Sequence, residues 1–293
     1  MEKLGRLITA MATPFDEKGA VNFKKVEELV EHLLKTGSDG IVVHGTTGES
    51  PTLTHEEEYE LYKAVKKTVA GRASVIAGTG SNSTETTIKS TKRAQEIGCD
   101  AALLVVPYYN KPSQEGLYRH FKAVSDNTDI PLILYNIPGR TGINMAPETI
   151  ARLSQIKNFI GVKDAAGDVN QTSSTRMLCG SDFTIWSGDD SMTLPMMSVG
   201  GYGVISVVSH IAGKEIKAMI EAFASGNTKK AQELHIKLMP LFKVLFITSN
   251  PSPLKYALSL TGLDCGGTRL PLVDPSENEK ELISKVMKEL KII

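Results

Sequence analysis

Eight short apolar segments recur along the first 210 residues of the chain, and amphipathic stretches separate most of them. The segments are apolar throughout, with no alternation of apolar and polar residues. This pattern is typical of strands that are buried on both faces of a parallel sheet. The segments cover residues 7–13, 40–45, 74–78, 101–106, 131–136, 159–164, 183–188 and 203–208.

The stretches between these strands have helical spacing. Residues 23–33 place their apolar side chains on one stripe of a helix. Thr54 can cap the next helix while Glu57 reaches back to it, which is a capping box. Further helical patterns fit residues 83–97, 113–125, 147–155 and 170–178.

Eight strands joined by helical crossovers predict an α/β fold of the (β/α)8 TIM-barrel type, because an open doubly wound sheet more often has about five or six strands. On this pattern alone, the open α/β sheet remains the alternative. Only helical patterns follow residue 210, so we expect a catalytic barrel over residues 1–225 and a C-terminal helical region over residues 226–293. The last helices are predicted at residues 212–224, 227–246, 251–261 and 276–291.

The charge balance narrows the classes of partner. Lysine and arginine together number 33, as do aspartate and glutamate, so nothing predicts binding to nucleic acid or to a membrane surface. A small anionic substrate needs only one or two local cations. The three cysteines are far apart, and no stretch approaches the roughly 18 apolar residues of a membrane helix. We therefore expect a cytoplasmic protein.

In a (β/α)8 barrel, catalytic side chains come from the carboxyl ends of the strands and from the loops that follow them. Lys163 ends the apolar segment 159–163 and is the unusual residue among these positions, because lysine is rarely buried. Desolvation would lower the pKa of its amine and leave a free base that can attack a carbonyl. The alternative is a structural lysine that pairs with Asp164 or Asp189, and position alone does not decide between the two.

Hydroxyl groups at neighbouring strand ends favour the first interpretation. An imine mechanism needs proton transfer at several steps and donors for a substrate carboxylate. Thr46, Thr47, Tyr109 and Tyr135 can supply both, and Arg140 adds a cation with bidentate geometry for a carboxylate. Residues 78–80 lack the rest of a nucleotide-binding glycine motif, and the six histidines show no ligand spacing, so we expect no cofactor and no metal site.

These motifs together resemble the dihydrodipicolinate synthase family, within the superfamily of pyruvate-dependent lyases. The resemblance covers nearly the whole chain. Its motifs lie at residues 12–15, 45–50 (GTTGES), 107–112 (PYYNKP), 135–142 (YNIPGRTG), 161–168 (GVKDAAGD), 187–190 (SGDD), 203–207 (GVISV), 250–255 and 269–272.

The resemblance implies a role for each matching residue. Lys163 forms the imine with pyruvate, and Tyr135 is the acid–base residue at the reacting carbon. Thr46 and Tyr109 complete a proton relay with Tyr135, and Tyr109 reaches in from a neighbouring subunit. Pyruvate is held by Thr47, the main chain of Ile205 and Gly188, while Arg140 positions the carboxylate of L-aspartate 4-semialdehyde.

Two features of the sequence bear on which member of the superfamily the chain resembles: Arg140 with the paired threonines, and the segment that follows Lys163. N-acetylneuraminate lyases share the lysine and tyrosine motifs but normally lack an arginine at the position of Arg140. The paired threonines and Arg140 therefore favour the synthase over an aldolase of sialic acid or of 2-keto-3-deoxy sugar acids. A catalytically silent paralogue that binds keto acids is the alternative outside the enzymes. Asp164, Ala165 and Ala166 depart from the family's usual Glu-Ala-Thr/Ser, which bears on how the lysine is placed.

Assembly and regulation also follow from the resemblance. A residue that acts across an interface implies an oligomer, and we expect a homotetramer built as a dimer of dimers. Family members that respond to lysine bind it near the positions of Ser50, His55, Asn82 and Tyr108. Here, Glu58 stands where sensitive enzymes often have a histidine, and Thr86 stands where an acid would meet the amine of lysine, with Glu85 one place away. We therefore expect weak or absent inhibition by lysine.

Overall fold

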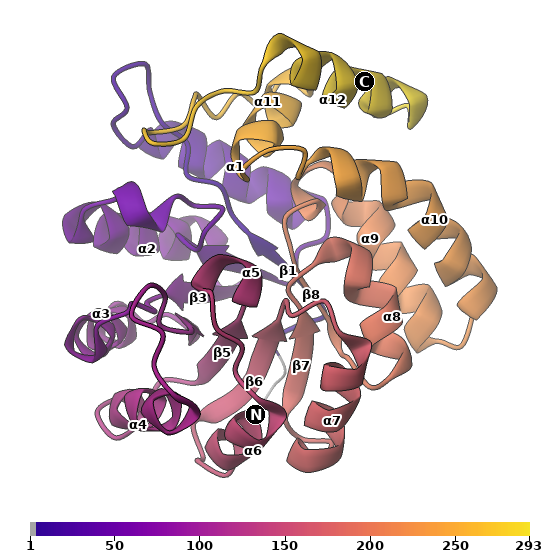
Figure 1. The fold of residues 1–293 in the computed structure, drawn as a ribbon. Coiled ribbons are helices and arrows are strands. Elements are labelled where there is room, and N and C mark those ends of the chain that lie inside the picture. Colours follow the sequence, from indigo (N-terminus) through magenta and orange to yellow (C-terminus); the bar gives the residue numbers. More distant parts are fainter. Residues whose placement is uncertain (1–3) are drawn as a thin grey trace. The chain divides into compact units, whose positions relative to one another are not determined.

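The computed structural model describes residues 4–293 and contains eight parallel strands that follow one another around a closed barrel (Figure 1). The predicted (β/α)8 fold is confirmed, and the open-sheet alternative is wrong. The strands are β1 (Leu7–Ala10), β2 (Gly40–Val43), β3 (Ser74–Gly78), β4 (Ala101–Val105), β5 (Leu132–Asn136), β6 (Phe159–Asp164), β7 (Thr184–Ser187) and β8 (Gly203–Ser206).

All eight predicted segments form strands, although most strands are shorter than the predicted segments and the first differs most. Strand β1 ends at Ala10, whereas the apolar segment continues to Thr13. Met11 still donates its backbone N–H to the oxygen of Val42 at 3.0 Å, so the chain follows β2 for one residue beyond the strand. An apolar run therefore predicted burial correctly here but overestimated the length of the strand.

By its internal contacts, the described chain divides into two compact units, and each is described by itself. The unit over Ser74–Ile205 contains β3 to β7, most of β8 and the helices between them. The three longest helices of this unit start at the capping side chains of Ser83, Ser113 and Asp168, which accept backbone N–H groups. The helices are α3 (Thr84–Ile97), α4 (Gln114–Ser125), α5 (Pro138–Thr141), α6 (Pro147–Ser154), α7 (Val169–Cys179) and α8 (Thr193–Ser198), with a 3-10 turn η2 at Asp190–Met192.

Strand register in this unit brings particular residues to one level. Strands β5 and β6 pair Tyr135 with Lys163 and Asn136 with Asp164. Strands β6 and β7 pair Lys163 with Trp186. Because residues paired across neighbouring strands project to the same face, Tyr135, Lys163 and Trp186 form one row near the carboxyl ends of these strands.

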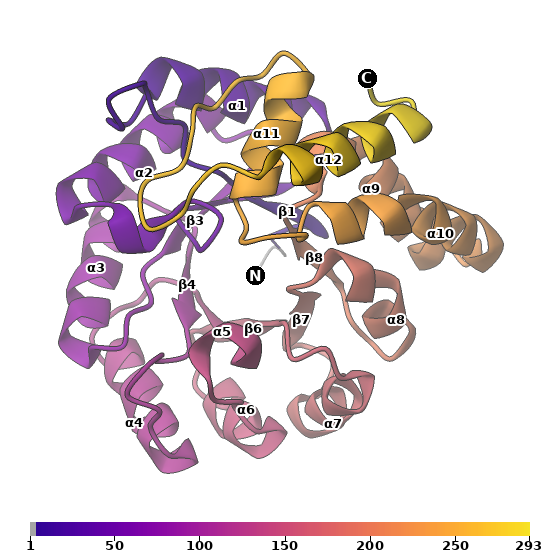
Figure 2. The ribbon, with the colours of Figure 1, turned by 45° about the horizontal axis from the view of Figure 1, so that its top comes forward.

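The other unit consists of residues 4–73 with Ser206–Ile293. Within it, α9 packs against both α1 and α10, while α11 packs against α12 (Figure 2). The four helices predicted after residue 210 are all present. The helical elements of this unit are α1 (Phe23–Lys35), the 3-10 turn η1 (Ser50–Thr52), α2 (His55–Val69), α9 (Ser209–Ala224), α10 (Thr228–Val244), α11 (Ser252–Leu260) and α12 (Glu277–Glu289).

The capping box predicted at Thr54 and Glu57 is present at the start of α2. The division expected between residues 225 and 226 stays a prediction. Among residues 4–293, no helix is both long enough and apolar enough to cross a membrane.

Candidate active site

Lys163 is the next-to-last residue of β6, and its side chain is only 5% exposed. Its Nζ lies 4.4 Å from the centre of the Tyr135 ring, which is the neighbour that the strand register supplies. A Cβ atom on Gly188 would come within 3.1 Å of the lysine Cε. Glycine at this position therefore leaves room for the lysine stem, whereas the predicted contact of Gly188 with pyruvate stays a prediction.

The electrostatic setting of Lys163 favours a free amine. Burial lowers its pKa from 10.5 to about 8, the negative charge of Asp190 opposes this change, and the positive charge of Arg140 adds to it. Within the described residues, Lys163 forms no ion pair and donates no hydrogen bond. A lysine with this pKa is a much better nucleophile at neutral pH than an exposed one.

The structural alternative for Lys163, an ion pair with Asp164 or Asp189, is wrong. Asp164 accepts a hydrogen bond from Asn136 Nδ2 at 3.1 Å and another from the backbone N–H of Ala166 at 3.2 Å. Asp189 accepts from the N–H of Ser191 at 2.8 Å and starts the turn η2. Both carboxylates are thus engaged locally and turned to other partners.

The hydrogen bonds of Asp164 give this residue, at which the sequence departs from the expected motif, a structural role. Asn136 also donates to Asn144 at 2.7 Å and accepts from the backbone of Met145 at 3.0 Å. The backbone N–H of Ala165 donates to the oxygen of Asn136 at 2.8 Å. The ends of β5 and β6, which carry Tyr135 and Lys163, are therefore fixed to one another by a buried network of amides and one carboxyl. Burial raises the pKa of Asp164, so its carboxyl is protonated more readily than an exposed aspartate.

Tyr135 lies near the end of β5, and Arg140 lies in the turn that follows this strand. Tyr135 is 6% exposed within β5, whereas Arg140 is exposed in the single turn α5 that follows. Gly142, with φ of 76°, ends this turn in the left-handed conformation that glycine adopts without strain. The charge of Arg140 acts on the pKa of Lys163, so the structure brings the predicted cation into electrostatic range of the predicted nucleophile.

Tyr109 differs from the other predicted residues because its side chain is 89% exposed. Its backbone has φ of 71°, a left-handed conformation that is strained for a residue with a bulky side chain. The neighbouring Asn110 donates to the backbone oxygen of Asn82 at 3.0 Å, which holds the loop in place. The predicted action of Tyr109 across a subunit interface stays a prediction.

The predicted threonines lie in the other unit, in the turn that follows β2. Thr47 is 2% exposed, and its Oγ1 accepts a hydrogen bond from Asn250 Nδ2 at 2.9 Å. Thr46 is partly exposed. The predicted contact residue Ile205 belongs to β8 and is fully buried, and the contact of its main chain with pyruvate stays a prediction.

The residues predicted around a lysine-binding cleft have local partners. His55 Nδ1 lies 2.8 Å from the carboxylate of Glu58. Glu85 pairs with Lys89 at 2.7 Å on the exposed face of α3. Ser50 starts the turn η1, while Asn82 and Tyr108 lie in loops of the other unit.

Sequence reasoning missed two residues that bear on the site. Asp190 is 2% exposed, and its charge acts on Lys163, although the sequence interpretation favoured its neighbour Asp189 as the candidate partner. Asn250 contacts Thr47 from a position 203 residues away. Adjacency within a motif could have indicated Asp190, but no local signal connects Asn250 with the threonines. Within residues 4–293, no group of three or more histidine, cysteine, aspartate or glutamate side chains is arranged to hold a metal ion.

Comparison with known proteins gives a consistent result over nearly the full length. The model of the Dihydrodipicolinate synthetase family matches residues 3–290. The 4-hydroxy-tetrahydrodipicolinate synthase of Desulforamulus reducens is 54% identical over 290 residues, which are 99% of this chain and 98% of that protein. The solved dihydrodipicolinate synthase of Bacillus anthracis has a TM-score of 0.96 at 49% identity and covers 98% of this chain and 99% of its own. The enzyme of Cyanidioschyzon merolae, solved with lysine bound, has a TM-score of 0.97 at 47% identity over 99% of both chains.

Proposed function

The chain belongs to the dihydrodipicolinate synthetase family, and we propose that it condenses pyruvate with L-aspartate 4-semialdehyde through an imine on Lys163. Its enzyme class is that of the 4-hydroxy-tetrahydrodipicolinate synthases, lyases of lysine and diaminopimelate biosynthesis. The aldolases of sugar acids and the silent paralogue are not supported by any of the relatives described above. The reaction needs no external cofactor.

The proposed reaction starts with attack of the neutral amine of Lys163 on the keto carbon of pyruvate, and loss of water from the carbinolamine gives the imine. Removal of a proton from the methyl group gives an enamine, whose carbon attacks the aldehyde and forms the new carbon–carbon bond. The amine of the semialdehyde then displaces Lys163 from the imine carbon and closes the ring. One water is lost overall, and the lysine returns as a free amine.

The other residues carry the roles that their positions in the family motifs imply. Tyr135, Thr46 and Tyr109 pass protons at the carbinolamine and enamine steps. Thr47, the main chain of Ile205 and Gly188 hold the pyruvate end. In addition, Arg140 binds the carboxylate of the semialdehyde through its planar guanidinium.

The observation that carries this proposal is the state of Lys163, which is buried, lacks an ion-pair partner among the described residues, and has its pKa lowered to about 8. The test is to incubate the protein with pyruvate, add borohydride and map the adduct by mass spectrometry of peptides. We expect a stable adduct on Lys163 and none on Lys255, an equally buried lysine that serves as the internal control. Labelling of another lysine, or of none, would contradict the mechanism.

A coupled assay tests the second substrate. The protein should turn over pyruvate with L-aspartate 4-semialdehyde and should leave sialic acid and 2-keto-3-deoxy sugar acids unchanged. The variant Arg140→Gln is expected to raise KM for the semialdehyde and still to form the imine at saturating pyruvate, because the substrate group assigned to Arg140 is the carboxylate of the semialdehyde. A lost imine in this variant would contradict that assignment.

For the assembly, we propose a homotetramer built as a dimer of dimers. The support is the side chain of Tyr109, which is almost fully exposed on a strained backbone although the relay needs it within a site. Sedimentation equilibrium should give a mass of four chains. Mixing inactive Lys163→Ala subunits with inactive Tyr109→Phe subunits should restore activity, because some sites then receive both native residues.

For regulation, we propose that lysine inhibits weakly or not at all. The ring of His55 is already paired with Glu58, and Glu58 stands where sensitive enzymes often have a histidine. Calorimetry should detect no tight binding of lysine, and Glu58→His should increase the affinity. Tight binding to the unchanged protein, with matching loss of activity, would contradict this proposal.

We also propose a cytoplasmic location. Cys99, Cys179 and Cys265 form no disulfide within residues 4–293, which suits a reducing compartment. Fractionation of cells that express the full chain would test this.

A further inference from the structure

The turn at residues 45–50, which carries both threonines, is closed on itself. The backbone N–H of Gly48 donates to the oxygen of Gly45 at 3.0 Å, and the N–H of Glu49 donates to the oxygen of Thr46 at 3.1 Å. A Cβ atom on Gly48 would lie 2.6 Å from the Cα of His44, so only glycine fits at this position. The hydrogen bond from the N–H of Glu49 to the oxygen of Thr46 links the backbone of Thr46 to that of Glu49.

Glu49 is held by residues from the far end of the sequence. Its carboxylate lies 2.7 Å from Lys255 Nζ and accepts a hydrogen bond from the backbone N–H of Arg269 at 2.9 Å. The side chains of the pair are 3% exposed for Lys255 and 1% exposed for Glu49. Lys255 also donates to the oxygen of Gly267 at 2.8 Å, and its ammonium lies 4.2 Å from the centre of the Phe15 ring. A buried ion pair with this many additional contacts has one geometry, unlike a pair on the surface.

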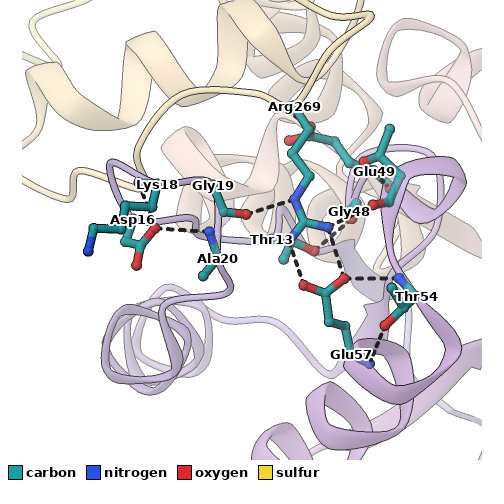
Figure 3. Close-up of polar contacts among 11 residues, drawn as sticks. Thr13, Asp16, Lys18, Gly19, Ala20, Gly48, Glu49, Thr54, Glu57 and Arg269 are labelled. Carbon is teal, nitrogen blue, oxygen red and sulfur yellow. Dashed lines mark hydrogen bonds and ion pairs between the residues drawn. The ribbon is translucent and has the colours of Figure 1, made fainter.

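The segment at residues 265–269, which we call the C-terminal strap, is itself firmly attached. Arg269 donates to the backbone oxygens of Gly19 and Thr52 and forms two hydrogen bonds with the carboxylate of Glu57 (Figure 3). The backbone N–H of Phe15 donates to the oxygen of Cys265 at 2.9 Å. These contacts do not involve the turn at residues 45–50, so the strap provides a fixed support for Glu49.

A second contact reaches the turn directly. Asn250 Nδ2 donates to Thr47 Oγ1 at 2.9 Å, and Asn250 is 4% exposed. The Oδ1 of Asn250 is buried and has no hydrogen-bond partner among the described residues, which is an uncommon state for a buried amide. Because Thr47 Oγ1 accepts this bond, its own hydroxyl hydrogen remains available to be donated elsewhere.

We propose that Glu49, Lys255 and Asn250 are positioning residues, which hold Thr46 and Thr47 in place for catalysis from the C-terminal part of the chain. This inference rests on the proposed function, since it takes from there the roles of Thr46 in proton transfer and Thr47 in holding pyruvate. The pair of Glu49 and Lys255 fixes the backbone of the turn. Asn250 directs the hydroxyl of Thr47 toward donation.

If the pair had a purely structural role, kcat and the melting temperature would change together. The test therefore measures the two quantities separately. The full-length variants are Lys255→Met and the double variant Glu49→Gln with Lys255→Met. Lys280→Met is the matched control, because Lys280 is partly exposed and pairs with the exposed Glu277 at the same 2.7 Å in the same unit. For each variant, kcat, KM for pyruvate, the melting temperature and the yield of borohydride adduct on Lys163 are measured.

We expect Lys255→Met to lower kcat on the order of 10²-fold, the effect of displacing a catalytic group by about 1 Å, while the adduct on Lys163 still forms at saturating pyruvate. The double variant should regain the melting temperature that Lys255→Met loses, because it no longer buries an unpaired carboxylate, and its kcat should stay low. If Lys255→Met does not fold, the double variant decides alone. Recovery of kcat together with the melting temperature would overturn the proposal, as would a kcat that no variant changes.

Asn250→Ala extends the test to Thr47. It should raise KM for pyruvate about tenfold, the loss expected when one hydrogen bond to a carboxylate is no longer well directed. An unchanged KM would remove Asn250 from the proposal.

Hydrogen exchange distinguishes failure of this inference from failure of the proposed function. The amides of residues 48–50 should exchange faster in Lys255→Met than in Lys280→Met, whatever the substrate is. If the unchanged protein does not condense pyruvate with the semialdehyde, the proposed function fails, while the exchange result still decides whether the pair of Glu49 and Lys255 fixes the turn at residues 45–50. Equal exchange in the two variants would show that the pair does not fix the turn.

Discussion

Lys163 and Lys255 are buried to nearly the same extent, 5% and 3% exposed, but their surroundings differ. Lys255 lies in the unit that contains the C-terminal helices and has a carboxylate at 2.7 Å, a carbonyl at 2.8 Å and an aromatic ring beneath it. Lys163 lies in the unit over Ser74–Ile205 and has an aromatic ring at 4.4 Å but no ion-pair partner among the described residues. Burial lowers the pKa of both amines, and Glu49 opposes this effect at Lys255 by direct contact, whereas Asp190 opposes it at Lys163 without one.

The difference shows that partners, more than burial, decide what a buried lysine does. An amine that is fully paired stabilises one local structure and has no lone pair to offer a substrate. An amine that is buried with fewer partners is less stable as a cation. Its pKa is therefore lower, and a larger fraction of it is the neutral base that can react. The same substitution at the two lysines should therefore change the free energy of unfolding in opposite directions.

The largest difference should be in catalysis. Lys163→Met removes the only proposed nucleophile, so we expect condensation to fall by several orders of magnitude and the borohydride adduct to vanish. Steady-state assays and peptide mapping measure both. Lys163→Arg, which keeps a cation but cannot form this imine, should be equally inactive. An adduct that persists on another lysine in these variants would show that Lys163 is not the nucleophile, and the comparison with Lys255 would then fail.

The second difference should be in stability, with opposite signs. Lys255→Met leaves Glu49 as a buried unpaired charge and should lower the free energy of unfolding by about 3–5 kcal/mol. Lys163→Met removes a buried amine with no close counter-ion and should raise it, on the order of 2 kcal/mol at pH 7. Urea unfolding followed by the fluorescence of Trp186, the single tryptophan, measures both. Changes of the same sign would show that the two sites are electrostatically alike.

A third test uses pH. With a pKa of about 8, the neutral fraction of Lys163 and the rate of imine formation should rise about tenfold between pH 7 and pH 9. The folded pKa lies below the ordinary value of 10.5, so between about 8 and 10.5 the unfolded chain binds a proton that the folded chain has lost. Stability attributable to Lys163 should therefore rise with pH across this window and be constant below it. Single-turnover rates and urea titrations of the protein and of Lys163→Met measure the two effects, and an imine rate that is flat from pH 7 to 9 would contradict the lowered pKa.

The fold was largely predictable from the sequence, because fully apolar strands and amphipathic helices differ in period. The elements that were missed are short. Helix α8 has the sequence Thr-Leu-Pro-Met-Met-Ser, which has no polar face and contains a proline, so it lacks a helical pattern. The single turn α5 contains Pro138 and Gly139 within four residues, and its conformation depends on contacts beyond its own sequence.

The site was predictable where chemistry lies at a strand end and unpredictable where it depends on distant contacts. The position of Lys163 after an apolar strand was sufficient to select it. Sequence could not decide whether it had a partner, since Asp164 lies next to it and two aspartates follow β7. Only the direction of each carboxyl resolves this, and that direction is set by hydrogen bonds to Asn136 and Ser191. The support of Thr47 by Asn250 has no local signature at all.

The smallest predicted effect concerns Asp190. Its charge opposes the lowering of the pKa at Lys163, and in this respect Lys163 resembles Lys255, which also has a carboxylate that opposes this change. Because the charge of Asp190 raises the pKa of Lys163, Asp190→Asn should lower the midpoint of the pH profile for imine formation below about 8, by less than about one pH unit. Asp189→Asn is the matched control, because that carboxylate is engaged with Ser191 and is not among the charges that act on the lysine. Arg140→Gln should shift the midpoint upward, since its positive charge lowers the pKa. If Asp189→Asn and Asp190→Asn shift the midpoint equally, no single carboxylate sets the pKa of Lys163, and the direct contact of Lys255 with Glu49 is then the only difference between the two lysines that the comparison keeps.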